Sequence, residues 1–112
     1  MFKNIVLLSA VVFFVLPLTI EANNLAQSTC EYIAADNKKR LRALLKDNRL
    51  KVKTLNKMVF CDNKDILLFA DEKKAFEVGK MIVKKLPKKI IRKALPSLQH
   101  EALITAANDR VN

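Results

Sequence analysis

The sequence predicts an all-α protein, a small bundle of five to seven short helices stapled by one disulfide bond. Three observations lead to this prediction. The 112 residues include a single glycine, Gly79, although tight β-hairpins and phosphate-binding loops both depend on glycine. Beyond residue 22, apolar residues recur at steps of three and four, which is the spacing of one helix face. Cys30 and Cys61 are the only cysteines, and a chain of this size gains considerable stability from a covalent staple.

The N-terminus has the three parts of an export signal. Lys3 supplies positive charge, an apolar run follows from Ile5 to Ile20, and Ala22 offers a small residue at a cleavage position. The run is sixteen residues long, which is shorter than the roughly 18–20 residues that a membrane-spanning helix needs. We therefore interpret residues 1–22 as a signal peptide of an exported protein, periplasmic or secreted. An uncleaved membrane anchor is the alternative.

An exported chain with two cysteines predicts a disulfide between Cys30 and Cys61. Thirty residues lie between them, and closing such a loop contributes roughly 3–4 kcal/mol in the chain-entropy description. The alternative is a pair of free thiols used in redox or metal chemistry. The spacing matches neither a CxxC pair nor a set of zinc ligands, which favours the disulfide.

Capping residues and apolar spacing divide the segment before Cys61 into three helices. Ser28 and Glu31 have the form of a capping box and predict a helix from Ser28 to about Ala35. Asp36-Asn37 ends this helix and caps a second one, which continues to Asp47-Asn48. A third helix is expected from about Lys51 to Phe60, with apolar residues at steps of three and four.

The segment after Cys61 predicts the remaining helices. The turn Asp62-Asn63-Lys64-Asp65 caps a fourth helix that is mostly buried. Asp71-Glu72 opens a fifth, which ends before Pro87. Further helical segments follow from Lys88 to Leu95 and, after Pro96-Ser97, to about Asn108. The side chains expected to be most buried are Leu41, Leu44, Leu45, Leu55, Ile66, Phe69 and Phe76.

Pro87 marks the one internal boundary that the composition indicates. We expect residues 23–86 to form the disulfide-stapled helical domain. Residues 87–112 are expected to form a basic C-terminal helical extension, either a helical hairpin or a loosely attached tail.

Residues 28–84 carry an ordered set of motifs: Cys30-Glu31-Tyr32-Ile33-Ala34-Ala35, a leucine-rich helix, Cys61, a polar turn and Phe69-Ala70. This order resembles a family of short exported proteins from gammaproteobacteria that is known only as a domain of unknown function. The resemblance implies an exported, two-cysteine helical protein, and it implies no activity. The family often has an Asn-Gly turn after its second cysteine, where this chain has Asp62-Asn63-Lys64. It also tends to place a glycine where Lys74 stands.

No group of residues forms a recognisable catalytic or metal-binding set. His100 is the only histidine, and a lone histidine on a polar helix face is usually a surface residue. Asp62 and Asp65 are explained by helix capping, and Lys64 stands where a calcium loop needs an oxygen ligand. We therefore expect no enzyme activity, no catalytic residue, no cofactor and no metal ion.

Positive charge is the most informative feature of the mature chain. Removal of residues 1–22 leaves a formal charge of +10, which favours attraction to anionic surfaces. Nine basic residues lie between Lys38 and Lys57, and seven lie between Lys80 and Lys93. On one helix, the cations of the second run gather opposite its apolar residues, although Pro87 makes two shorter helices the expected arrangement. The residues expected to bind an anionic surface are Lys84, Lys85, Lys88, Lys89, Arg92 and Lys93.

These patterns rank the functions that the chain can serve. The first is a non-enzymatic binding module for an anionic envelope partner, such as a membrane surface or an acidic polysaccharide, or for another envelope protein. The alternative is a membrane-active or inhibitory protein that acts through residues 80–95. The simplest explanation of the lysines is that they form a solvent-exposed helix face without a binding role. Nucleic acid is not an expected partner, because an export signal precedes the basic run Lys38-Lys39-Arg40-Leu41-Arg42.

Overall fold

Helices make up most of the chain in the computed structural model, which describes residues 16–112 and the side chains of residues 24–112. The α-helices are α2 (Leu16–Ala34), α3 (Lys38–Asp47), α4 (Val52–Met58), α5 (Ile66–Glu72), α6 (Phe76–Lys85), α7 (Lys88–Ala94) and α8 (Glu101–Val111), with a short 3₁₀ helix η2 (Leu95–Ser97) before α8. The described residues contain no strand, and a disulfide joins Cys30 to Cys61. The predicted all-α class with one disulfide is therefore confirmed.

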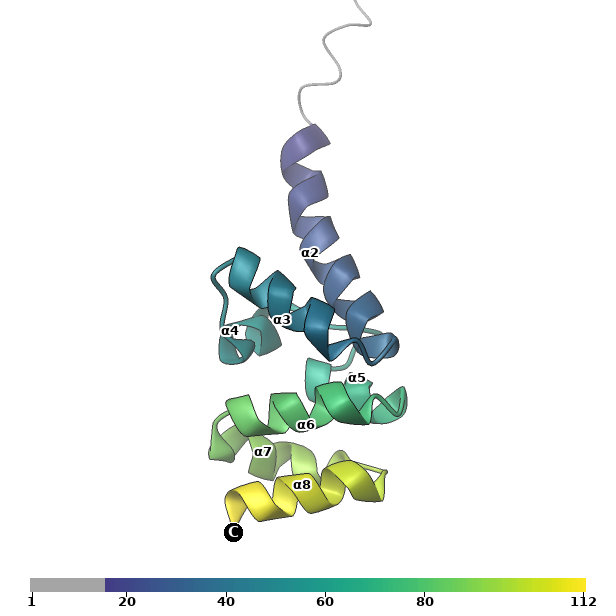
Figure 1. Ribbon diagram of the computed structural model, residues 1–112, viewed down its shortest axis with the longest axis vertical. Helices are drawn as coiled ribbons and strands as arrows, with labels where there is room; N and C mark the ends of the chain where they lie inside the picture. The colour runs from purple at the N-terminus through teal and green to yellow at the C-terminus, as the bar shows by residue number, and fades with distance from the viewer. Residues whose placement is uncertain (1–15) are drawn as a thin grey trace, which may run out of the picture.

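The helices form two layers, and α2 packs beside α3 with its C-terminal part while its N-terminal part projects from the bundle (Figure 1). Helices α3, α6 and α8 lie one below another on the near side, and α4, α5 and α7 lie behind them. Helix α6 contacts α3, α4, α5 and α8, so it is the central element of the bundle. None of the helices in the described part of the chain is long and apolar enough to cross a membrane. The predicted signal peptide, residues 1–22, lies outside the residues whose side chains are described.

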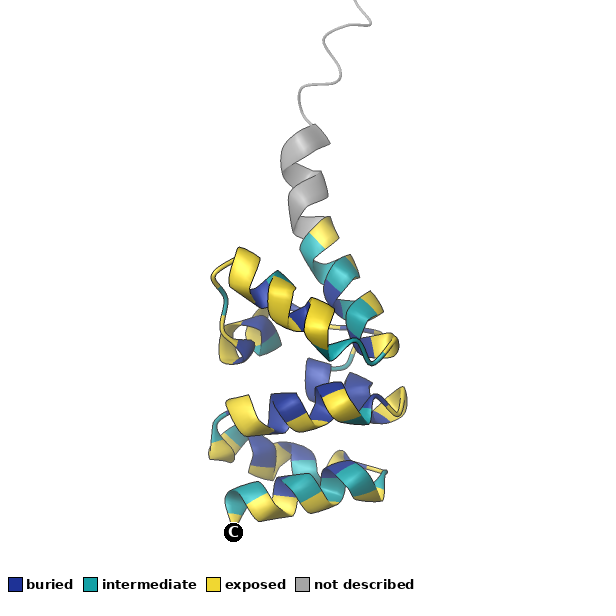
Figure 2. Cartoon of the chain, in the orientation of Figure 1, coloured by how far each residue is buried: buried dark blue, intermediate teal, exposed yellow. Residues whose placement is uncertain are grey.

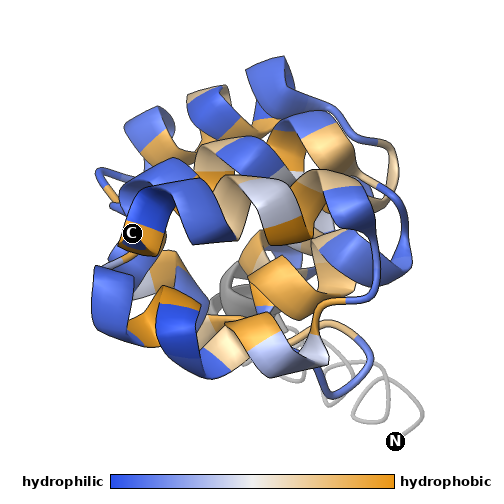
Figure 3. Cartoon of the chain, turned by 90° about the horizontal axis from the view of Figure 1, so that it is seen from below, coloured by the Kyte–Doolittle hydropathy of each residue, from blue (hydrophilic) through white to orange (hydrophobic). Residues whose placement is uncertain are grey.

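One hydrophobic core runs through all of these layers. Buried residues line the inner faces of the helices, and exposed residues cover the outside (Figure 2). Viewed from below, the helices turn hydrophobic residues toward one another and hydrophilic residues outward (Figure 3). The fully buried side chains with the largest volumes include Ile33, Leu41, Leu55, Ile66, Leu67, Ile82, Leu86, Ile91 and Leu103.

Five of the seven predicted core residues are buried as expected: Leu41, Leu45, Leu55, Ile66 and Phe69. The prediction is wrong for Leu44 and Phe76, which are only partly buried. Leu44 lies at the rim between α2 and α3, beside a shallow hollow that Leu25 also lines. Phe76 is the first residue of α6, and its ring lies against His100 with 5.6 Å between the ring centroids.

The C-terminal segment packs against the central helix. Residues 87–112 contribute Ile91, Leu103 and Ala107 to the same core, each with no exposed surface. Leu103 of α8 lies directly over Gly79 of α6, where an added Cβ would come within 2.7 Å of the leucine methyl carbons. The single glycine of the chain therefore serves the close packing of two helices.

Two predicted helix boundaries are wrong. The first helix does not begin at Ser28, because α2 continues upstream through this position and leaves no N-terminus there for Ser28 to cap. The neighbouring Thr29 instead donates its hydroxyl to the carbonyl of Leu25 at 2.7 Å, within the helix. Likewise, Asp71-Glu72 ends α5 rather than opening the next helix, which begins at Phe76.

Three helices end in the same way without glycine. In α2, α3 and α5 the residue after the C-cap has a left-handed backbone, with φ of 53° at Asp36, 53° at Arg49 and 58° at Lys74. In each case the next backbone N–H bonds back to the carbonyl five residues earlier, as Ala75 does to Ala70 at 2.8 Å. This pattern is the Schellman motif, in which glycine is the usual left-handed residue.

Candidate functional site

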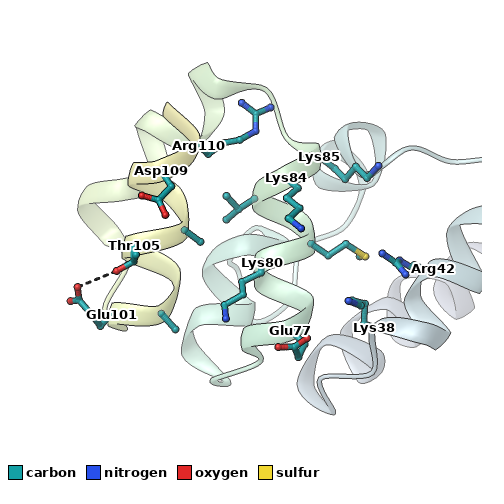
Figure 4. A pocket seen from close by; sticks show the side chains of 14 residues that line it. Lys38, Arg42, Glu77, Lys80, Lys84, Lys85, Glu101, Thr105, Asp109 and Arg110 are labelled. Carbon is teal, nitrogen blue, oxygen red and sulfur yellow. Dashed lines mark hydrogen bonds between the residues drawn. The ribbon is translucent and has the colours of Figure 1, made fainter. Parts of the chain in front are cut away.

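An open groove of about 730 Å³ crosses α3, α6 and α8 (Figure 4). We call it the basic groove, because its lining includes six cationic side chains and three carboxylates. The cations are Lys38 and Arg42 of α3, Lys80, Lys84 and Lys85 of α6, and Arg110 of α8. The carboxylates are Glu77, Glu101 and Asp109. The groove therefore has an excess of three positive charges.

Helical spacing places the cations in two rows. Lys38 and Arg42 are four residues apart on α3, and so are Lys80 and Lys84 on α6, so each pair lies on one face of its helix. Each helix also has a buried side, which includes Leu41 in α3 and Ile82 in α6. Figure 4 shows Lys38 and Arg42 reaching from α3 toward α6, on the side where Lys84 projects.

The two ends of the groove differ in charge. Helix α3 contributes only the cations Lys38 and Arg42, whereas α6 contributes Glu77 besides its lysines, and α8 contributes Glu101 and Asp109. Arg110, the cation of α8, donates a hydrogen bond from Nη2 to the carbonyl oxygen of Leu86 at 3.1 Å, which holds it at the end of α6. The hydroxyl of Thr105 lies 3.2 Å from Glu101 Oε1. The carboxylates of the groove therefore come from α6 and α8, and none comes from α3.

The cations of the groove have no carboxylate partner within the described residues. The ion pairs there are Lys64–Glu72 at 3.2 Å and the contact of His100 Nδ1 with Asp71 Oδ1 at 3.3 Å, and neither lies in the groove. Like charges held close together repel, and an anion placed between them relieves this repulsion.

The residues predicted to bind an anionic surface fall into two groups. Lys84 and Lys85 line the basic groove, on α6. The other four are Lys88, Lys89, Arg92 and Lys93; they are exposed on α7, and none of them lines the groove. The helix is interrupted between the two groups, because Leu86 and Pro87 have extended backbones with ψ of 150° and 146°.

The sequence did not predict that α3 and α6 lie side by side. Lys38 and Arg42 belong to the first basic run and Lys84 to the second, so both signals were present in the sequence. The pairing of the runs depends on α3 packing against α6, a contact between segments about forty residues apart. Hydrophobic periodicity shows that each helix has a buried face, but it does not say which helix covers that face.

Other residues singled out from the sequence have structural roles. Asp65 is the N-cap of α5 and accepts a hydrogen bond from the Leu68 N–H at 2.9 Å. Asp62 lies in the two-residue turn between Cys61 and Lys64, with φ of 52°. His100, expected on the surface, is partly buried and contacts Asp71. Across the described residues, no three metal-ligating side chains come together.

The comparisons with known proteins give one match. The family model described as "Protein of unknown function (DUF3718)" matches residues 29–92. The search of curated proteins finds no match, and neither does the search of solved structures. The matched segment begins beside Cys30 and continues into α7.

Proposed function

The chain belongs to the DUF3718 family of proteins of unknown function, and we propose that it is an exported, non-enzymatic binding module for an anionic partner of the cell envelope. The observation that carries the proposal is the basic groove, in which cations of α3 and α6 lie together without a carboxylate partner among the described residues. The family description names no activity, so the proposal depends on the chemistry of this surface.

Three further features support the proposal. The formal charge of +10 draws anions toward the whole protein and raises the rate of encounter. The disulfide is a feature typical of proteins that fold outside the reducing cytosol. The groove also has a size within the range of ligand pockets, which is roughly 300–1,000 Å³.

Retention on a heparin-like resin and on vesicles of anionic lipid tests the proposal. We expect the protein to be retained at low salt and released as salt rises, since exposed charges are screened beyond about 8–10 Å at physiological ionic strength. A groove variant, K38Q/R42Q/K84Q/K85Q, should lose retention by about a hundredfold or more, because each cation contributes on the order of 1 kcal/mol near an anionic surface.

A charge-matched control separates a specific surface from net charge alone. The variant K46Q/K51Q/K53Q/K57Q also removes four cations, all of them exposed and outside the groove. We expect it to lose much less retention than the groove variant. Equal losses would attribute binding to net charge, and no retention of the unmodified protein at low salt would leave the lysines as a solvated face.

The alternative function, membrane activity through residues 80–95, is constrained by the packing of this segment. Its apolar residues Ile82, Leu86 and Ile91 have no exposed surface. Insertion into a membrane would therefore require α6 and α7 to leave the core. Leakage of dye from anionic vesicles distinguishes the two functions, because a folded binding module should adhere to vesicles without releasing their contents.

A further inference from the structure

The three helices that line the basic groove contribute charges of different sign. Helix α3 contributes two cations, and α6 contributes three lysines and Glu77, so the share of each helix is +2. Helix α8 contributes Glu101, Asp109 and Arg110, so its share is −1. The charge of the lining is therefore positive on α3 and α6 and negative on α8.

The negative charge comes from a row of polar side chains on α8. Glu101, Thr105 and Asp109 are spaced by four residues, so they lie on one face of the helix, and all three are exposed. Thr105 donates its hydroxyl to Glu101 Oε1 at 3.2 Å. The ion pairs of the described residues include neither carboxylate. These carboxylates therefore repel a ligand that carries only negative charge, and they attract a cationic group.

Helix α6 separates this row from the cations of α3. Helix α6 contacts both α3 and α8, and the three helices lie one below another (Figure 1). Because the axes of packed helices are about 8–10 Å apart, a ligand that reaches from α3 to α8 spans about 16–20 Å. This is the length of roughly five to six extended residues at about 3.3 Å each. A single phosphate or carboxylate can contact only one side of the groove.

We propose that the basic groove binds an acidic peptide segment of a partner protein, which lies across α6 and carries an ammonium group at one end. The acidic end contacts the cations of α3, where Arg42 can form two parallel hydrogen bonds with a carboxylate. The ammonium group contacts Glu101 and Asp109 of α8. An acidic polysaccharide or an anionic bilayer would place further negative charge against α8, whereas a peptide carries both signs of charge along one chain. This inference rests on the proposed function and specifies its partner.

Two synthetic hexapeptides test this polarity. The first has the sequence lysine-serine-glycine-serine-glutamate-glutamate, with positive charge at its free N-terminus and negative charge at its C-terminus. The second has an acetylated N-terminus and glutamine in place of the lysine, so it keeps only the negative charge. At physiological ionic strength, where charges beyond about 8 Å are screened, the native protein should bind the first peptide at least about threefold more tightly. Attraction by net charge alone predicts the reverse order, because the second peptide is the more negative one.

The methionines report where the peptide binds. Met81 lines the groove, whereas Met58 is 54% exposed at the end of α4 and does not line it. With the methionine methyl groups of the protein labelled for NMR, saturation with the first peptide should shift the Met81 resonance and leave the Met58 resonance in place. A shift at Met58 alone would place the site elsewhere and overturn the proposal.

Variants of α8 test the contact with the ammonium group. E101Q/D109N should weaken binding of the first peptide by about threefold or more and strengthen binding of the second, since each exposed ion pair contributes a factor of about 1.4 to 5. The control E31Q/D47N also removes two exposed carboxylates, both outside the groove. It should change the affinity for either peptide by less than about twofold. Urea unfolding of both variants confirms that the fold is intact.

The outcomes separate this inference from the proposed function. If the native protein binds the second peptide as well as the first, or better, the peptide proposal is wrong although the proposed anion binding stands. Equal effects of E101Q/D109N and E31Q/D47N would also contradict it. If neither peptide binds but anionic vesicles or heparin-like resin retain the protein, the partner is a bilayer or a polysaccharide and the peptide proposal is again wrong. If none of these anions retains the protein, the proposed function fails as well.

Discussion

Asp36 caps helix α6, although Val78, the residue whose backbone it binds, lies 42 positions further along the chain. Its Oδ1 accepts a hydrogen bond from the Val78 N–H at 2.8 Å, and its Oδ2 accepts one from the Glu77 N–H at 3.4 Å. The N-cap position of α6 is Ala75, which has no side chain able to do this. Asp36 itself stands at the left-handed end of α2. One residue therefore ends one helix and begins another, and it holds α6 near α3 at the basic groove.

Replacement of Asp36 should separate its two roles. Asp36→Ala loses the cap and places alanine in a left-handed conformation, and it should lower the free energy of unfolding by roughly 1–3 kcal/mol. Asp36→Gly loses the cap but accepts the conformation, so it should cost less. Asp36→Asn should cost least, because its amide oxygen can still accept a hydrogen bond. Urea unfolding measures the order; an alanine variant as stable as the native protein would contradict the capping role.

Asp71 holds the turn that leads into α8, and it does so from a buried position. The residue is 3% exposed, and its two oxygens accept hydrogen bonds from the N–H groups of Gln99 at 2.8 Å and His100 at 3.1 Å. Asp71→Ala should lower the free energy of unfolding by roughly 1–3 kcal/mol, because it removes two part-buried hydrogen bonds to a charged acceptor. The neighbouring Glu72 forms an exposed ion pair with Lys64, so Glu72→Ala is the control and should change stability little. Equal costs for the two variants would refute this account.

The disulfide should contribute a large part of the stability of this small domain. Cys30 of α2 and Cys61, which follows α4, are 31 residues apart in sequence and 5.7 Å apart between Cα atoms. Cys61→Ser should lower the free energy of unfolding by roughly 2–5 kcal/mol, as is typical of native bridges in small exported proteins. Alkylation without reductant, followed by intact-mass measurement, checks the pairing itself. Two alkylated thiols in the native protein would show that the bridge is absent.

Substitution by glycine should stabilise the protein at residues whose backbone is left-handed. Asp62 and Asn63 both have positive φ, and Cys61 and Lys64 exchange two hydrogen bonds of 2.9 Å around them. This is the geometry that Asn-Gly or Asp-Gly favours in a two-residue turn. Asn63→Gly and Lys74→Gly should each raise the free energy of unfolding by about 0.5–1 kcal/mol, since only glycine adopts this conformation without steric cost.

The control for these glycine substitutions lies inside a helix. Lys46 is exposed in α3, and Lys46→Gly should lower stability by about 1 kcal/mol. Thermal or urea unfolding of the three variants gives the comparison. A loss of stability in Asn63→Gly or Lys74→Gly would show that the native side chain makes a stabilising contact. The loss of this contact would then cost more free energy than the removal of backbone strain gains.

Local signals predicted two helix caps correctly, although the capping box at Ser28 predicted a helix start that is not there. Asn37 and Asp65 cap the helices that follow them, because each binds an N–H only three residues away. Asp36 and Asp71 have partners about thirty to forty residues away, and nothing in their neighbourhood indicates this. Asp71 was accordingly predicted to open a helix that it does not begin.

The candidate site also depends on contacts between distant segments, which local sequence does not indicate. Two runs of basic residues are visible in the sequence, but the groove takes only some members of each. Lys38 and Arg42 join Lys84 and Lys85 because α3 packs beside α6, whereas Lys88 and Lys89 follow the break at Pro87 and lie on α7. Which helices become neighbours is decided by long-range packing of their apolar faces, and periodicity alone carries no information about the partner.

This division of the second basic run gives a direct test of where anions bind. K84Q/K85Q and K88Q/K89Q each remove two exposed lysines and the same net charge, but only the first pair lines the basic groove. We expect K84Q/K85Q to weaken retention on anionic vesicles or heparin-like resin by about tenfold, and K88Q/K89Q to weaken it by no more than about threefold. Neither pair should change the free energy of unfolding by more than about 0.5 kcal/mol, because the side chains are solvated. If K88Q/K89Q has the larger effect, the anionic partner contacts α7 rather than the groove. If both pairs have the same effect, net charge alone governs retention.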